Sequence, residues 1–230
     1  MLLVIAALFA VGVGRLAIWV NHPRSRLLTT ILLTLACSYA LALPEVDHAV
    51  DHRTAPILSD NISDLTQTIL LVCVCYGLGR ISLRSVDGDR YIHPWTAAAL
   101  TAIGAMLVAY SLSRLARTPV DDATTLTDSP TVTFFMIYLG YLALTCALII
   151  LGTIRGIRTQ PGDLRWPLLA ICVMAVLGAA YAINAAALLV FWPAIFHRSQ
   201  GDIFQLWSGP ALTLLAVAGL WGLVIALRHR

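Results

Sequence analysis

Lysine is absent from this sequence of 230 residues, and glutamate occurs only once, at Glu45. Charged residues make up 12% of the chain, hydrophobic residues make up 59%, and the mean hydropathy is +0.84. Soluble domains carry roughly 25% charged residues, which keep a folded surface hydrated. The composition therefore excludes an ordinary soluble domain and predicts a chain whose main solvent is lipid.

Long apolar runs fill nearly all of the chain and leave short polar connections between them. A helix needs about 20 residues to cross a hydrocarbon core of roughly 30 Å. We therefore predict an all-α polytopic membrane protein, a single seven-helix transmembrane bundle over residues 1–230. No basic segment precedes the first run, which favours an uncleaved helix over a signal peptide. The expected helices cover residues 1–20, 27–43, 61–83, 94–115, 130–152, 166–191 and 204–227.

The arginines divide unequally between alternate connections. Short cytoplasmic loops retain basic residues, and this bias sets the orientation of a membrane protein. With the N-terminus outside, eleven arginines lie on the cytoplasmic side and four lie outside, so we predict an N-out, C-in topology. The cytoplasmic arginines are Arg15, Arg24, Arg26, Arg80, Arg84, Arg90, Arg155, Arg158, Arg165, Arg228 and Arg230, and the outer ones are Arg53, Arg114, Arg117 and Arg198.

Chemistry-bearing residues are missing where a membrane enzyme or pump would need them. All five cysteines fall inside the expected helices, so no disulfide framework is indicated in the loops. No acidic, basic or histidine side chain occupies the middle of an expected helix. Proton-coupled transport paths and haem ligation across helices need such groups at that depth. We therefore expect no cofactor and no enzymatic activity, and a proton-driven transporter is disfavoured.

An Asp-His-x-x-Asp-His pattern covers residues 47–52 in the longest outer connection. If this segment is helical, His48 and His52 share one face, and Asp51 adds a carboxylate beside them. Two imidazoles at that spacing can share a metal ion, although a third ligand would have to come from another outer loop. The alternative interpretation is a solvated acidic turn at the membrane interface.

A second candidate site consists of polar side chains near the ends of the expected helices. Under the predicted topology they lie in the outer half of the bilayer, where they would line an outward-facing cavity that binds a ligand. Ionisable groups at that depth are costly unless paired or hydrated, so we expect Asp64 to pair with Arg114 or Arg117. The alternative is that these residues mark helix ends and hydrogen-bond neighbouring helices. The predicted ligand-binding residues are Asp64, Gln67, Arg114, Tyr138 and Asn184.

Small residues recur at four-residue spacing along the sixth expected helix, at Gly178, Ala182 and Ala186. In lipid, small residues allow helix backbones to approach closely, so this face is expected to pack within the bundle or in a homodimer. Trp95 and Trp207 lie near the ends of expected helices, where indole rings prefer the headgroup region. We interpret both tryptophans as membrane anchors.

The segment from Thr30 to Gly79 runs from a leucine- and alanine-rich helix through Pro44, Asp47 and Asp51 into the third helix. It resembles an actinobacterial family of seven-transmembrane-helix integral membrane proteins classed as transporters. The resemblance implies seven helices over essentially the whole chain and a multi-pass protein of the bacterial plasma membrane. Members commonly continue into a cytoplasmic domain of unknown function. This chain ends without one, so we expect a membrane-only member or a shortened chain.

Three functions fit these observations. The first is a receptor-like module that binds a small molecule, a lipid or a partner protein at the outer cavity. The second is a transporter or permease, and the third is a structural accessory subunit of a larger membrane complex that has no ligand of its own. The expected partners are the lipid bilayer and a second protein or copy of the chain, and no nucleic acid.

Overall fold

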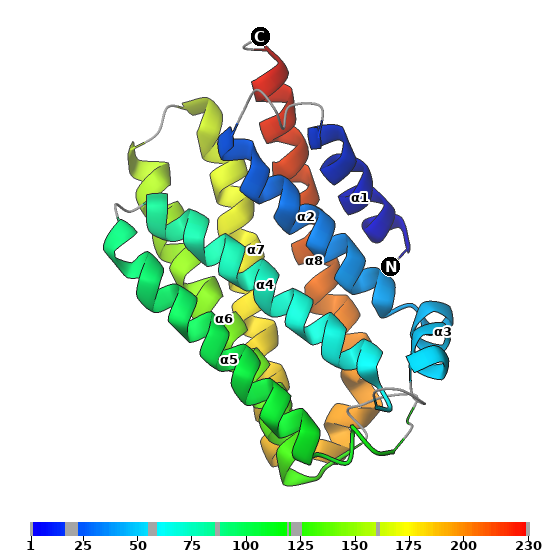
Figure 1. Cartoon of the computed structure of the whole chain (residues 1–230). Helices are drawn as coiled ribbons and strands as arrows, with labels where there is room; N and C mark the ends of the chain where they lie inside the picture. Colours follow the sequence, from blue (N-terminus) through cyan, green and yellow to red (C-terminus); the bar gives the residue numbers. More distant parts are fainter. Residues whose placement is uncertain are drawn as a thin grey trace.

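The computed structural model describes residues 2–16, 23–54, 59–85, 88–118, 120, 126–159 and 162–228 (Figure 1). Every regular element in these ranges is a helix, which confirms the all-α prediction for the described residues. In chain order the elements are α1 (Leu2–Leu16), α2 (Pro23–Leu41), α3 (Pro44–Thr54), α4 (Ile62–Ser85), the 3-10 turn η1 (Asp89–Tyr91), α5 (Ile92–Leu112), α6 (Ser129–Thr159), α7 (Gly162–Phe191) and α8 (Pro193–Arg228).

Within the described residues, four helices are long and apolar enough to cross a membrane: α4, α5 with η1, α6, and α7 from Arg165 onward. A fifth span results if α2 and α3 count as one, although they are bent by 80° at the break between them. The described parts of α1 and α8 contain shorter apolar segments, Ile5–Leu16 and Gly209–Trp221. Length and composition therefore indicate a multi-pass membrane protein.

Six helices form a closed ring. Along the ring α1 packs on α2, α2 on α4, α4 on α6, α6 on α7, α7 on α8, and α8 returns to α1. Helix α5 packs outside this ring against α4 and α6, and α3 lies across the end of α2 and α4 (Figure 1). Consecutive long helices run in opposite directions, so the connections gather at the two ends of the bundle. This arrangement encloses a central space bounded by helices that are far apart in the sequence.

Prolines begin several of the helices. Pro23, Pro44 and Pro193 are the first residues of α2, α3 and α8, and Pro130 is the second residue of α6. Proline suits the first turn because its fixed φ is already helical and its missing N–H would have no partner there. Pro23 therefore extends the second helix four residues before the predicted start, into a segment expected to be a turn.

The helices at one side of the bundle are longer than predicted. Helix α6 has 31 residues, about 46 Å at 1.5 Å per residue, which exceeds a hydrocarbon core of roughly 30 Å. Only Trp192 separates α7 from α8. An outer loop was expected at residues 192–203, but residues 193–203 form the start of α8. Hydropathy locates the part of a helix that lies in lipid, so it does not mark where a helix ends in water.

A buried arginine joins the first and last helices of the ring. Arg15 is only 5% exposed, and its Nη1 donates a hydrogen bond of 2.9 Å to the carbonyl oxygen of Gly219 in α8. Arg15 was predicted at the cytoplasmic side within the first helix, and in the structure it belongs to the last turn of α1, where its side chain is buried. The bond closes the ring by joining α1 to α8.

Trp95 is buried rather than anchored at the membrane surface. Its ring stacks on Tyr141 of α6 with centroids 4.8 Å apart, and its Nε1 donates to the carbonyl oxygen of Tyr76 in α4 at 3.0 Å. A Cβ added to Gly79 would lie 2.4 Å from the same ring. Trp95 thus fills the contact between α4, α5 and α6, and the anchor interpretation is wrong for this residue.

We predict that replacing the Tyr141 hydroxyl by hydrogen stabilises the protein. This hydroxyl is buried and has no hydrogen-bond partner among the described residues, and a buried polar group without a partner costs about 1–3 kcal/mol. Tyr141→Phe keeps the ring stacking and removes that cost, so we expect it to raise the free energy of unfolding by about 1 kcal/mol. Equilibrium unfolding in mixed micelles measures the change.

Tyr76→Phe is the matched control, because the Tyr76 hydroxyl has a partner in the Thr96 hydroxyl at 3.2 Å. We expect this second variant to be neutral or less stable than the wild type. A loss of stability in Tyr141→Phe would mean that the hydroxyl is satisfied in the folded protein, against this prediction.

Asp128 caps the N-terminus of α6. Its Oδ1 accepts the Thr131 hydroxyl at 2.7 Å, and its Oδ2 accepts the backbone N–H groups of Thr131 and Arg114, each at 3.3 Å. Partial burial raises the pKa of Asp128, but these hydrogen bonds together outweigh burial and leave the pKa below its usual value. The carboxylate therefore stabilises the folded state when it is ionised.

We predict that Asp128→Ala lowers the free energy of unfolding by about 1 kcal/mol at pH 7. Because the folded pKa lies below the unfolded value of about 3.9, the contribution is fully present above about pH 4 and is lost as the pH falls through the folded pKa. Thermal unfolding at pH 7 and at pH 3 measures this. Asp128→Asn, which retains a capping oxygen without the charge, should lose less. Equal stability of Asp128→Ala and wild type at pH 7 would refute the cap.

Candidate functional site: a cavity inside the helix ring

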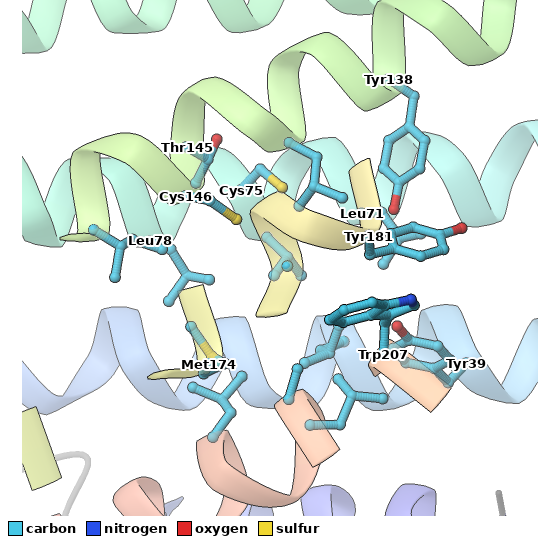
Figure 2. A pocket seen from close by; sticks show the side chains of 18 residues that line it. Tyr39, Leu71, Cys75, Leu78, Tyr138, Thr145, Cys146, Met174, Tyr181 and Trp207 are labelled. Carbon is cyan, nitrogen blue, oxygen red and sulfur yellow. The ribbon is translucent and has the colours of Figure 1, made fainter. Parts of the chain in front are cut away.

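A cavity of about 110 Å³ lies inside the ring and is lined by residues of α2, α4, α6, α7 and α8 (Figure 2). Half of its lining residues are aliphatic, with leucines from all of these helices except α7. The five helices come from all parts of the sequence, from Leu35 to Leu215. The cavity therefore exists only when the whole bundle is assembled.

One end of the cavity is aromatic. Tyr39 of α2, Tyr138 of α6, Tyr181 of α7 and Trp207 of α8 gather there, as Figure 2 shows. Tyr39 lies two residues before the end of α2, and Tyr138 lies in the first third of α6. Both positions are close to the end of the bundle that carries α3. The aromatic residues therefore face the end predicted to be the outer mouth.

The other part of the cavity wall carries sulfur. Cys75 of α4 and Cys146 of α6 are each 4% exposed, and Met174 of α7 lies farther from the aromatic end (Figure 2). The Thr145 hydroxyl beside them is satisfied, since it donates to the carbonyl oxygen of Tyr141 at 2.8 Å. Gly178 lies opposite Cys146, and a Cβ at Gly178 would lie 2.9 Å from the cysteine sulfur. This region offers polarizable, apolar surface to an occupant.

The five residues predicted to line an outer cavity do not come together. Tyr138 does line the cavity, whereas Asn184 is exposed on the surface of α7. Arg114 is exposed, and the described part of the chain shows no ion pair between it and Asp64. Asp64 and Gln67 lie in the first two turns of α4, outside the cavity wall. Of the five, Tyr138 alone lies in the described wall of this cavity, and ligand binding by the other four stays a prediction.

The first turns of α4 use backbone oxygens for local contacts. The carbonyl oxygen of Asp64 accepts the Thr68 hydroxyl at 2.7 Å, and that of Gln67 accepts the Ser38 hydroxyl at 3.1 Å. The second bond joins α4 to α2. Both bonds use backbone carbonyls, so neither of them assigns a role to the Asp64 or Gln67 side chain.

The candidate metal residues lie in α3, which is helical as the pattern required, and His48 and His52 are exposed there. Asp51 caps α4, because its two carboxylate oxygens accept the backbone N–H and the hydroxyl of Ser63, each at 2.9 Å. The Ser63 hydroxyl also contacts the Asp47 carboxylate. No three histidine, cysteine, aspartate or glutamate side chains within the described ranges are grouped as a metal ion requires. Asp51 therefore stabilises a helix end, and we do not propose a metal site.

Asn61 and Tyr110 join the segment before α4 to the segment around the end of α5. Asn61 has a φ of 52°, and its amide contacts three backbone groups of the segment after α5, at Leu115, Thr118 and Val120. The Tyr110 hydroxyl contacts the backbone oxygen of Asp60 and the Ser59 hydroxyl. The loops at this end are therefore held against α4 and α5.

The small-residue ridge of α7 faces α6 within the same chain. Gly178 approaches Cys146, and Ala182 is 1% exposed in a cluster with Leu139 of α6. Ala186 is partly buried against that cluster. The ridge thus permits the close approach of α6 and α7 that closes the cavity on one side.

Among the lining residues that the sequence did not indicate are two aromatic ones, Trp207 and Tyr39. Trp207 was interpreted as a membrane anchor, and Tyr39 was treated as an ordinary member of an apolar run. Their signal is weak because both lie on helices that are apolar on most faces, so the sequence does not indicate which face points inward. The spacing of aromatic residues near helix ends was the available hint.

Comparisons with family models, with curated proteins and with solved structures find no match for this chain. The family resemblance noted in the sequence therefore stays a prediction. The function has to be argued from the cavity itself.

Proposed function

We propose that this protein is a receptor-like membrane module that binds a small, mostly apolar molecule in the cavity inside its helix ring. The observation that carries the proposal is the cavity of about 110 Å³ bounded by five helices. Ligand sites are concave, mostly apolar and supplied with a few polar groups, and in bundles they lie between helices. An occupant would contact every helix of the ring except α1, so its binding favours one arrangement of the ring.

The size of the cavity limits the ligand. A protein cavity of about 150 Å³ lined by aliphatic and aromatic side chains binds benzene. The present cavity is somewhat smaller, at about 110 Å³, so it fits one ring or a compact branched hydrocarbon. An intact phospholipid, a peptide or a nucleotide is much larger. The proposal therefore concerns a small molecule that reaches the site through the bilayer or the outer mouth.

The proposal includes the seven-crossing, N-out and C-in topology in a bacterial plasma membrane. Two features support it. The long helices alternate in direction, and the arginine-bearing ends of α2, α4, α6 and α7 lie at the end of the bundle opposite α3 (Figure 1). Cytoplasmic loops retain arginine, so the aromatic end of the cavity would lie in the outer half of the membrane.

Filling the cavity should abolish binding. Leu142 of α6 lines the cavity, and its replacement by tryptophan adds a large ring to a space of about 110 Å³. A ligand that binds only the folded state raises thermal stability. We expect toluene to raise the melting temperature of the wild-type protein in lipid nanodiscs and to have no such effect on Leu142→Trp.

Leu144→Trp is the matched control. Leu144 lies on the same helix two residues away, is 50% exposed and lines a separate hollow beside Trp95, so the new ring would not enter the cavity. This variant should respond to toluene as the wild type does, which separates binding from effects on the bilayer. Equal responses of all three proteins would contradict the proposed function.

A further inference from the structure

Apart from the Thr145 hydroxyl and the two thiols, the polar side chains of the cavity lie at one end. Tyr138 and Trp207 approach this end from α6 and α8, with Tyr39 and Tyr181 beside them (Figure 2). A phenol can donate a hydrogen bond, and an indole N–H can only donate. Within the described residues, neither the Tyr138 hydroxyl nor the Trp207 nitrogen forms a hydrogen bond with the protein. The cavity therefore offers donors to an occupant.

No charged side chain and no histidine lines the described cavity wall. A charge moved from water into such a site has no opposite charge to compensate its lost hydration, so its burial is strongly unfavourable. Carboxylates, amines and phosphate groups are therefore poor occupants. The ligand that matches this wall is neutral.

The remaining wall matches a ring with little additional bulk. Aromatic side chains prefer offset or edge contacts with another ring, and the thioether of Met174 and the thiols of Cys75 and Cys146 adapt to apolar surfaces. The volume of about 110 Å³ holds about one ring, so a substituent on that ring must lie toward the aromatic end or leave the cavity.

We infer that the cavity selects neutral single-ring compounds that carry a carbonyl oxygen, which accepts hydrogen bonds from Tyr138 and Trp207 while the ring lies against the aliphatic and sulfur-bearing wall. This inference rests on the proposed function and adds the ligand class to it. The carbonyl group can belong to a free aromatic ketone or to the head of a larger membrane compound whose tail leaves the cavity.

Fluorine NMR titration in nanodiscs tests the inference with three probes of similar shape: 4-fluoroacetophenone, its alkene analogue 4-fluoro-α-methylstyrene, and 4-fluorobenzoate. We expect the ketone to bind and the benzoate not to bind. Loss of one neutral hydrogen bond weakens binding by about three- to tenfold, so Tyr138→Phe should lower the affinity for the ketone by that factor. The same substitution should leave the alkene unchanged, and comparing each probe between proteins cancels its partition into lipid.

Tyr141→Phe is the control variant, since this residue loses the same hydroxyl on the same helix but does not line the cavity. It should bind all probes as the wild type does. If the alkene binds and Leu142→Trp blocks it, but Tyr138→Phe affects ketone and alkene equally, the ligand class is wrong and the proposed function stands. If neither neutral probe binds, both are wrong.

The source of the ligand is tested by a matched pair of ketones, 4-fluoroacetophenone and a derivative with a long alkyl tail on the ring. Competition by the tailed compound for the same site indicates a membrane compound whose tail leaves the cavity. Failure of the tailed compound to compete indicates a free small molecule. Either result requires a site that binds the carbonyl-bearing ring. Loss of this binding in Leu142→Trp would show that the ring occupies the cavity.

Discussion

Asn61→Ala is expected to lower the free energy of unfolding by about 3–4 kcal/mol, because it removes three hydrogen bonds and places alanine in a left-handed conformation. Asn61 is 3% exposed and has a φ of 52°. Its Nδ2 donates to the carbonyl oxygens of Leu115 at 2.7 Å and Thr118 at 2.8 Å, and its Oδ1 accepts the Val120 N–H at 3.2 Å. The substitution leaves these backbone groups without their partner. Chemical unfolding in mixed micelles measures the loss.

Two further variants at this position separate the two causes. Asn61→Gly adopts the positive φ without strain but makes none of the three bonds, so it should be more stable than Asn61→Ala by about 1 kcal/mol. Asn61→Asp keeps the acceptor for Val120 and loses both donated bonds. Stability of the alanine and glycine variants within error of the wild type would show that the outer loop does not depend on this side chain.

Gly79→Ala has the second largest expected effect, a destabilisation of about 2–3 kcal/mol. The added Cβ would lie 2.4 Å from the Trp95 ring, which cannot move away easily. Tyr141 stacks on the other side of that ring, and the carbonyl oxygen of Tyr76 accepts its N–H at 3.0 Å. Relief of the clash must therefore break the stacking or the hydrogen bond, or separate α4 from α5.

Gly104→Ala provides the control for helix propensity. No atom lies within 4 Å of a Cβ built at Gly104 of α5, and alanine stabilises a helix over glycine by up to about 1 kcal/mol in water. The two substitutions are thus expected to change stability in opposite directions. Tryptophan fluorescence during thermal unfolding measures both. A Gly79→Ala protein as stable as the wild type would contradict the tight contact with Trp95.

The positions of the long helices could be predicted because the thickness of the bilayer fixes the length of an apolar run. The ends of these helices could not be predicted in this way. The segment 193–203 contains polar side chains, which suggested a loop, yet it begins α8. A helix continues into water wherever its backbone bonds are made and no residue breaks it. The same reason explains why α6 continues to Thr159.

The candidate site could be predicted only in part, and Tyr138 is the residue that was found. Asn184 and Tyr138 both lie at similar depth, but one faces the exterior and the other faces the cavity. Depth follows from position along a helix, whereas the inward face follows from how the helices pack around one another. When a helix is apolar on most faces, its sequence does not indicate which face points inward. For this reason the sequence did not indicate that Trp207 lines the cavity and that Asn184 is exposed.

For the acidic segment 44–54, the sequence predicted the helix but not the role of its aspartates. Its helical spacing was predicted correctly, and its chemistry was not, since Asp51 accepts hydrogen bonds from the start of α4. An aspartate near a helix N-terminus stabilises the unpaired N–H groups there, and this use competes with metal binding. The sequence alone did not show that α3 bends back onto α4.

An experimental density map of the protein in nanodiscs with saturating 4-fluoroacetophenone tests the central claim most directly. We expect density for one compact ring between Tyr138 and Trp207, with its carbonyl oxygen within hydrogen-bond distance of both, and no such density in Leu142→Trp. A map in which repacked side chains fill the space between α2, α4, α6, α7 and α8 would contradict the account.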